Sequence, residues 1–318
     1  MTAMQQAAAP SATTDKKTPL QPLGPDSLMW KDFGAHRYQL ILQQAFILQT
    51  AHPVIDAAVT KEKKYKYDPW GRARNSVSLL WPVVYSRPEK AVAMGHRLRE
   101  VHRPIKGVDK NGEKYHALDP EAYSWVHMTG YDAIVRLHDI FGTPLTPDQR
   151  RQAFEEWKKL GGLLGVADKY MPQTEAEYWK QYNHIINERL QWGEALDDLL
   201  DPWNFARWPK PPQAKYLPTF VWKLFAVPMS WLIYKITIAT LPQNFRDKFK
   251  LHMSAFDKLS FRIFVAMVKT VGAITPESMK YIPLAKRAFE DARKHPEAYR
   301  YQPETQNNTA TAAELASA

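Results

Sequence analysis

Cysteine is absent from this chain of 318 residues, and its absence limits the chemistry that the protein can perform. The chain forms no disulfide bonds, which excludes a disulfide scaffold but does not choose a compartment. With no thiolate present, a histidine imidazole is the first side chain to consider as a ligand for haem iron or another metal.

The signature motifs of several enzyme classes are also missing. The sequence has no Gly-x-Gly-x-x-Gly, no phosphate loop and no Gly-x-Ser-x-Gly elbow. Carboxylate-bridged di-iron sites need Glu-x-x-His on inward helix faces. The one segment with that spacing, Glu113 to His116, follows an Asn-Gly turn that predicts a hairpin instead. These absences argue against dinucleotide, nucleotide, serine-hydrolase and di-iron chemistry.

Alternating strand-like runs are scarce, whereas helix starts are common. Each start combines a capping residue with a following Pro or Glu, and they occur at Asp119-Pro-Glu121, Thr146-Pro-Asp-Gln149, Thr174 with Glu177, and Thr275-Pro-Glu277. With 45% hydrophobic residues, the chain can bury a sizeable core. We therefore expect an all-α fold with one helical domain over residues 26–300 and a short hairpin near Asn111-Gly112.

The two ends of the chain are poor in large apolar side chains. Residues 1–25 are rich in Ala, Thr, Gln and Pro, and residues 301–318 are similar. Because such segments bury too little apolar surface to offset the entropy of ordering, both are expected to be disordered tails. No apolar run follows a basic start and no twin-arginine pair lies near Met1, so we expect no export signal and a cytoplasmic location.

The most apolar segment, Tyr216 to Pro242, is not predicted to span a bilayer. Its longest uncharged run, Leu224 to Tyr234, has 11 residues and contains Pro228, so it is too short and too broken. Large aromatic and aliphatic side chains alternate there with Lys223 and Lys235. The segment is expected either to form an interfacial helix or to be buried within the helical domain, and burial is favoured.

The net charge of +10 and the pI near 9.4 indicate an anionic partner. Lys and Arg are spread along the chain, and the 11 Trp and 15 Tyr follow helical stripes instead of an RNA-binding signature, so no nucleic acid is expected. An anionic membrane surface, contacted peripherally, is the partner that this charge suggests. The sequence does not predict an oligomeric state.

One histidine falls on the apolar face of a predicted helix from Pro88 to Ile105. His102 lies about 40° from Leu98 and about 20° from Gly95, whereas His96 is about 240° away on the charged face. The apolar positions are Ala91, Met94, Gly95, Leu98, Val101 and Ile105. His102 is therefore predicted to face inward, either as an iron ligand or as a hydrogen-bonded core residue.

A second helical stripe, over Tyr123 to Phe141, carries His127. This imidazole is the rival iron ligand, and it is equally compatible with a place in the distal pocket or with plain core packing. Arg72 and Arg74 precede an apolar run and are compatible with solvated charges at a helix start. If haem is present, an arginine at the pocket edge can instead pair with a propionate.

Four ordered segments carry a resemblance to a known family. They are Asp68-Pro-Trp-Gly-Arg-Ala-Arg-Asn-Ser76, Val101-His-Arg-Pro-Ile-Lys-Gly107, Asn111-Gly-Glu-Lys-Tyr-His-Ala-Leu-Asp-Pro120 and Trp125-Val-His-Met-Thr129. Together they resemble the family of the fungal mycophenolic-acid oxygenase MpaB and the bacterial latex-clearing rubber oxygenases. The similarity extends, more loosely toward its end, over about residues 28 to 295.

The resemblance implies a globin-like fold that binds haem b through the histidine of the Val-His motif, here His102. In the rubber oxygenases an arginine, a lysine and a threonine face the distal side of the iron, and these match Arg72, Asn75 and Ser76. Asn75 departs from the pattern, since an amide cannot replace the amine that caps the iron. Lys106 keeps a positive charge one helical turn after His102 and would meet a propionate as a point charge. Thr129 matches the small polar residue that follows the Trp-Val-His motif.

The activity that the resemblance implies is oxidation or cleavage of a carbon–carbon double bond by dioxygen at haem iron. For an intracellular relative we expect a small lipophilic substrate, such as a terpenoid or an unsaturated acyl chain. The expected catalytic residues are Asn75, Ser76, His127 and Thr129, and the expected haem-binding residues are Arg72, His102 and Lys106. Two further function classes stay open, a haem sensor or carrier without turnover and a membrane-surface helical protein whose haem site has decayed.

Overall fold

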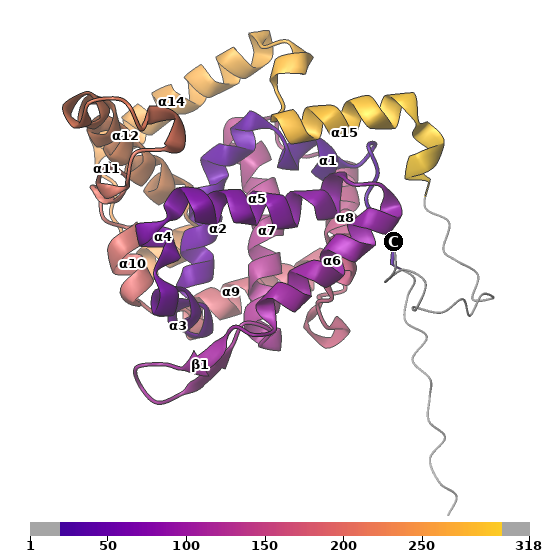
Figure 1. Cartoon of the computed structure of the whole chain (residues 1–318), viewed down its shortest axis with the longest axis horizontal. Helices are drawn as coiled ribbons and strands as arrows, with labels where there is room; N and C mark the ends of the chain where they lie inside the picture. Colours follow the sequence, from indigo (N-terminus) through magenta and orange to yellow (C-terminus); the bar gives the residue numbers. More distant parts are fainter. Residues whose placement is uncertain (1–19, 301–318) are drawn as a thin grey trace, which may run out of the picture.

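The computed structural model describes residues 20–300 as a helical bundle with one two-stranded hairpin (Figure 1). The all-α prediction is confirmed. The helices are α1 (Leu28–Phe33), α2 (Gln39–Thr50), α3 (Pro53–Glu62), α4 (Lys64–Tyr67), α5 (Pro69–Tyr85), α6 (Pro88–His102), α7 (Pro120–Phe141), α8 (Pro147–Leu164), α9 (Glu175–His184), α10 (Glu194–Leu199), α11 (Asn204–Arg207), α12 (Thr219–Thr240), α13 (Gln243–Lys248), α14 (Ala255–Ile274) and α15 (Pro283–Lys294).

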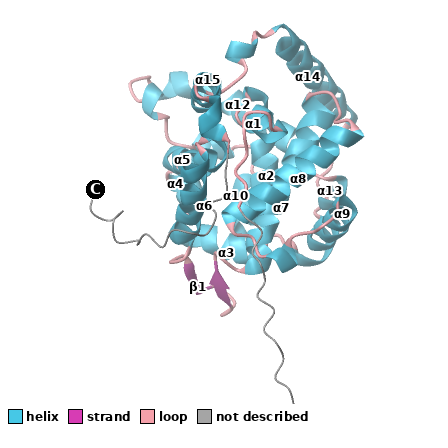
Figure 2. Cartoon of the chain, turned by 90° about the vertical axis from the view of Figure 1, so that its right-hand side faces the viewer, coloured by secondary structure: helices cyan, strands magenta, loops and turns pink. Residues whose placement is uncertain are grey.

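Helix α7 runs through the middle of the bundle, packed against α2 and α8 (Figures 1 and 2). It begins as predicted, because the Asp119 side chain accepts a hydrogen bond from the Ala122 amide and Pro120 fills the first turn. Most of its side chains are buried, including the indole of Trp125, which donates to the Leu48 carbonyl at 2.8 Å. Because α7 is central, a site inside the bundle would be lined by this helix.

Two more predicted helix starts are confirmed and one is wrong. Thr146 forms a capping box with Gln149 at the start of α8, and Thr174 caps α9. Thr275 instead ends α14, and Pro276 precedes only a 3₁₀ turn, Glu277–Met279. A capping residue followed by Pro indicates where a helical turn begins. Here the turn continues for only three residues, so no α-helix forms.

Helices α5 and α6 form a hairpin of helices that spread apart from their junction (Figure 1). Helix α6 ends at His102, three residues before the predicted Ile105. The reason is Pro104, which has no N–H to donate to the Glu100 carbonyl and so cannot continue the helix. The start of α5 and the end of α6, which carry most of the predicted site residues, lie at the open end of this hairpin.

The predicted hairpin follows α6. Strands β1 (Lys106–Val108) and β2 (Lys114–His116) pair antiparallel with Lys106 opposite His116. The connection turns at Gly112, whose φ of 85° lies in the left-handed region that glycine adopts without a Cβ penalty. Lys106 is therefore in a strand and not one helical turn beyond His102, which corrects that part of the prediction.

Part of the predicted amino-terminal tail belongs to the folded core. Residues 20–25 are described, and the Leu23 side chain is only 5% exposed against the hydrophobic cluster. Leu20 and Leu23 stand among Pro and Gly residues that form no regular element, so they carry no periodic signal and their burial could not be predicted. Residues 1–19 and the tail 301–318 lie outside the described residues.

Helix α12 departs most from the sequence prediction. It is a continuous helix of 22 residues despite Pro228, and by length and composition it is the one helix in residues 20–300 able to cross a membrane. Only 22% of its most apolar window is buried. The favoured prediction of burial within the domain is therefore wrong for most of this segment, and so is the expectation that it is too short to span. Figure 1 places α12 and α14 toward the edge of the molecule, and Figure 2 shows α14 at its edge from a second direction.

Candidate functional site

His102 is half-buried at the last turn of α6, and its ring orientation is set by its own helix. The Nδ1 atom lies 2.7 Å from the carbonyl oxygen of Leu98, one turn earlier. A carbonyl can only accept, so Nδ1 carries the proton and Nε2 presents its lone pair. Among residues 20–300 nothing hydrogen-bonds to Nε2, and the exposed His96 points to solvent as predicted. The helix thus holds an imidazole in the tautomer that ligates a metal.

Beside His102, one face of the first turns of α7 is only partly covered, although the rest of these turns is buried. The His102 ring meets the Tyr123 ring edge to face at 6.3 Å. One turn further along α7, Val126 is 39% exposed although most residues of this helix are buried. A Cβ added at Gly130 would meet no atom within 4 Å. Tyr123, Val126 and Gly130 share one helix face, so an open apolar strip runs along α7 away from His102.

Arg72 lies in the first turns of α5, on the other helix of the α5/α6 hairpin. Its guanidinium stacks 4.0 Å from the centroid of the Phe46 ring, and burial lowers its pKa to about 10. No carboxylate within residues 20–300 forms an ion pair with it. A half-buried cation without a counter-ion is costly, so this side chain is suited to an anionic group supplied by a ligand.

The remaining α5 candidates are exposed. Asn75 and Ser76 both face solvent, and the Asn75 carbonyl accepts a hydrogen bond from Ser78. The structure places them one turn beyond Arg72 on the same helix, apart from His102 on α6. Lys106 is exposed at the start of β1, beyond the end of α6. Lys106 is close to His102 in the sequence, but it lies in a strand and does not share the helix face of His102.

His127 is enclosed by core residues. Its ring stacks on Trp157 at 4.7 Å with an interplanar angle of 7°, and its Nε2 atom lies 2.9 Å from the Trp157 carbonyl oxygen. The Trp157 indole in turn donates to the His127 carbonyl at 3.0 Å. Burial lowers the pKa of His127 to about 3, so the ring is neutral. Its Nε2 proton is committed to the core, and this geometry supports core packing over a direct iron bond.

Thr129 is also fully buried, with its hydroxyl already paired. The hydroxyl donates to the Val126 carbonyl at 2.7 Å and accepts from the Gln49 side chain at 2.8 Å. It lies behind the open strip of α7 and links that helix to α2. His127 and Thr129 therefore belong to the packed core, whereas His102 on α6 and Arg72 on α5 are half-buried.

The sequence matches one protein family over residues 30–270, described as the catalytic domain of the ER-bound oxygenase mpaB/B' and rubber oxygenase. This match covers most of the chain. The chain belongs to this family of oxygenase catalytic domains. The resemblance seen in the sequence is thereby confirmed, and with it an oxygenase domain as the general class of activity.

The relatives of this oxygenase domain add no assigned activity. Two uncharacterized proteins, one from Mycobacterium bovis and one from Mycobacterium tuberculosis, are each 23% identical over 144 residues. The aligned region covers 44% of this chain and 56% of each relative, so the chain spans little more than half of their length. No solved structure matches the chain.

One buried histidine of the oxygenase domain was missed by sequence reasoning. His52 caps α3 and is 2% exposed, and neither ring nitrogen has a hydrogen-bond partner among the described residues. Its Nε2 atom lies 3.9 Å from a carboxylate oxygen of Glu121, which Arg189 also binds. Burial lowers the pKa of His52 and outweighs the carboxylate. The only signal was a histidine before Pro53, too weak to indicate this position.

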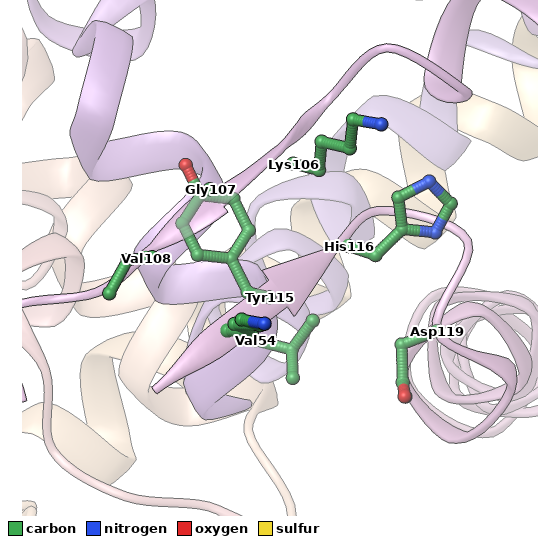
Figure 3. A pocket seen from close by; sticks show the side chains of 8 residues that line it. Val54, Lys106, Gly107, Val108, Tyr115, His116 and Asp119 are labelled. Atoms are coloured by element: carbon green, nitrogen blue, oxygen red, sulfur yellow. The ribbon is translucent and has the colours of Figure 1, made fainter. Parts of the chain in front are cut away.

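A hollow of the oxygenase domain lies at the hairpin, and His102 is not among its lining residues. It has a volume of about 540 Å³ and is lined by Val54, Lys106, Tyr115, His116 and Asp119 among others (Figure 3). Within residues 20–300, no three His, Asp or Glu side chains gather as a metal site. That excludes a metal held by several side chains of this region, whereas haem iron needs only one axial histidine.

Proposed function

We propose that this protein is a haem b-dependent oxygenase with His102 as the axial iron ligand and a lipophilic, unsaturated small molecule as substrate. The observation that carries the proposal is the hydrogen bond from His102 Nδ1 to the Leu98 carbonyl. This hydrogen bond leaves Nε2 unprotonated at the edge of an open apolar strip. The lone pair of Nε2 is then available to bind iron, as an axial ligand requires. The family supplies the oxygenase class.

The surrounding residues fit a haem in two respects. The macrocycle is flat and apolar, and the strip of α7 at Val126 and Gly130 offers apolar surface without a covering side chain. Haem also carries two propionates, and Arg72 is a half-buried guanidinium without a protein counter-ion. A bidentate pair with one propionate would satisfy it. Lys106 at the start of β1 is exposed and offers a point charge.

When bound, haem b supplies dioxygen activation next to a carbon–carbon double bond. The protein's own contribution is ligation, orientation and exclusion of water. His102 holds its ring by the Leu98 carbonyl, and the apolar side chains of Val101, Ile105 and Val126 present a surface suited to a lipophilic substrate. Asn75 presents a neutral amide on α5, so this helix offers no amine ligand at that position, and Ser76 retains a hydroxyl that can hold a proton.

The test is the visible spectrum of the purified protein and of matched histidine variants. We expect haem b to copurify with the full chain, and His102→Ala to lose most of the bound haem. His96→Ala is the control, because it removes an imidazole from the exposed face of the same helix. His102→Gly with added imidazole should recover a haem spectrum, since the free base can occupy the vacated position.

Folding of each variant is checked by circular dichroism, so that haem loss is separated from unfolding. Retention of full haem with an unchanged spectrum in His102→Ala would refute the ligand assignment. Loss of haem in His127→Asn with His102→Ala unaffected would move the ligand to His127. A protein that takes up no haem during expression or reconstitution would refute the proposed function as a whole.

A further inference from the structure

Exposed apolar side chains are concentrated in one region of the molecule. Of the 23 large hydrophobic residues that are exposed in residues 20–300, 16 lie between Tyr216 and Met279. Soluble proteins expose such side chains singly, whereas a contiguous patch marks an interaction site. This region is distinct from the His102 site, and it needs a separate explanation.

Helix α14 carries an apolar stripe that faces no other part of the described chain. Its exposed members recur at three- and four-residue spacing along the whole helix, and they are Phe256, Leu259, Ile263, Met267, Val271 and Ile274. Exposure reaches 70% at Phe256 and 77% at Ile274. None of the 20 residues of α14 is buried. On its inner face, Phe261 and Phe264 are partly covered where their rings meet the ring of Phe141 on α7. Helix α14 is therefore apolar on its inner side and carries a second apolar stripe that is turned outward.

Helix α12 presents a second exposed apolar face beside α14. Phe220, Leu224 and Phe225 are each at least 65% exposed, and Trp231 is also exposed. The two helices are joined by the ion pair of Lys235 with Asp257 at 2.7 Å, and the same lysine lies 4.8 Å from the centroid of the Trp231 ring. Figure 1 shows both helices toward the edge of the bundle. We call these exposed residues of the two helices the α12/α14 surface.

The charge on a different exposed face of α14 indicates what covers the stripe. Lys258, Arg262 and Lys269 follow a separate line along α14, are exposed, and form no ion pair within residues 20–300. The chain as a whole carries +10. A second copy would bring the same positive charge to the interface, where like charges oppose each other. An anionic lipid surface complements the charge, and aromatic and basic side chains suit its headgroup region.

We propose that the α12/α14 surface docks the protein on an anionic membrane, with both helices lying in the headgroup region. Helix α12 lies on the bilayer and does not cross it, because its other face is held by the domain. The Ser230 hydroxyl donates to the Pro202 carbonyl, and the last turn around Thr240 is buried in the core. Lys223 and Lys235 bind within the domain, to the Ala206 carbonyl and to Asp257, so the lipid-facing charge comes from α14.

The test is co-sedimentation of the full chain with vesicles of phosphatidylcholine, with and without phosphatidylserine, at low and high salt. We expect stronger binding to the anionic vesicles, weakened by salt because the attraction is screened over about 10 Å at 0.1 M ionic strength. Replacing Lys258, Arg262 and Lys269 by Gln should weaken binding by about tenfold or more. The matched control replaces Lys286, Arg287 and Lys294 of α15 by Gln, which removes the same charge from another helix and should leave most binding intact.

A second variant tests the apolar stripe. Replacing Ile263, Met267 and Val271 by Ser should weaken binding to vesicles of both compositions by about tenfold or more, because each side chain buries apolar area in the bilayer. All three are exposed, so thermal stability should hardly change. The proposal is overturned if the wild type does not sediment with anionic vesicles, or if the α14 and α15 charge variants lose binding equally. It is also overturned if analytical ultracentrifugation finds a dimer that the Ser variant dissociates and lipid does not affect.

Discussion

His102 and His127 differ in chemistry although both lie on apolar helix stripes. In His102, Nδ1 donates to a carbonyl of its own helix, which leaves the Nε2 lone pair without a hydrogen-bond partner among the described residues. In His127 the carbonyl of Trp157, on another helix, takes Nε2, and the indole covers the ring. One hydrogen bond at each ring therefore determines whether the Nε2 atom is free.

The neutral His127 predicts an acid-sensitive contribution to stability. Its pKa is about 3 in the folded protein and 6.5 in an unfolded chain. Between these values the unfolded chain binds a proton that the folded protein does not, so acid favours unfolding. The stabilisation is complete above pH 6.5 and decreases as the pH falls toward 3, by at most about 1.4 kcal/mol per pH unit.

Urea unfolding at several pH values measures this effect. We expect His127→Asn to be less stable at pH 7 by about 1–3 kcal/mol, because it disturbs a buried hydrogen bond, and to show a flatter pH profile between about pH 6.5 and 4.5. His96→Asn is the control and should keep the wild-type profile, since His96 is exposed. A wild-type slope that persists unchanged in His127→Asn would show that this ring is not the group responsible.

At the scale of elements, α6 is placed by close contacts with α8. A Cβ at Gly95 would overlap the carbonyl oxygen of Leu163, so only glycine allows the helices to approach this closely. Arg99 then donates to the carbonyl of Gly165, the left-handed residue that ends α8. These contacts position the last turn of α6, which carries His102.

Substituting Gly95 tests this helix contact. We expect Gly95→Ala to destabilise the fold by about 1–3 kcal/mol, because the overlap with a backbone oxygen forces α6 and α8 apart. Gly272→Ala is the matched control, since it also lies inside a helix but its Cβ would meet nothing within 4 Å. It should stabilise the protein by about 0.5–1 kcal/mol through helix propensity alone. Thermal or urea unfolding compares the two, and equal effects would contradict the close packing at Gly95.

At the scale of the whole molecule, the proposed haem site and the α12/α14 surface are carried by different elements. The Trp70 indole, at the start of α5, donates to the Pro209 carbonyl and meets the rings of Phe205 and Trp208 near α12. The two regions are thus neighbours through an aromatic contact, but they share no residue.

This separation predicts that the two functions can be removed independently. His102→Ala should bind anionic vesicles as the wild type does, within about twofold, because His102 lies on α6, outside the α12/α14 surface. The Ser variant of Ile263, Met267 and Val271 should keep its full haem content. Parallel measurement of haem absorbance and vesicle binding on both variants checks this. Loss of both properties in either variant would show that the regions are coupled.

Local patterns in the sequence determined much of the architecture. The caps at Asp119, Thr146 and Thr174, the Asn111-Gly112 turn and the opposite facing of His96 and His102 all depend on residues a few positions apart. The ordered motifs also indicated the oxygenase family, which the match over residues 30–270 confirms. Short-range steric and hydrogen-bonding rules were sufficient for these features.

Tertiary structure decided which faces are covered. The same apolar periodicity describes the buried stripe of α7 and the exposed stripe of α14, and nothing in the spacing says whether a partner helix lies opposite. Burial of Leu23, closure of His127 by Trp157 and the unpaired charge of Arg72 depend in the same way on distant segments. A sequence pattern specifies that a surface is apolar, whereas only the packing of the whole chain leaves it inside or turns it outward.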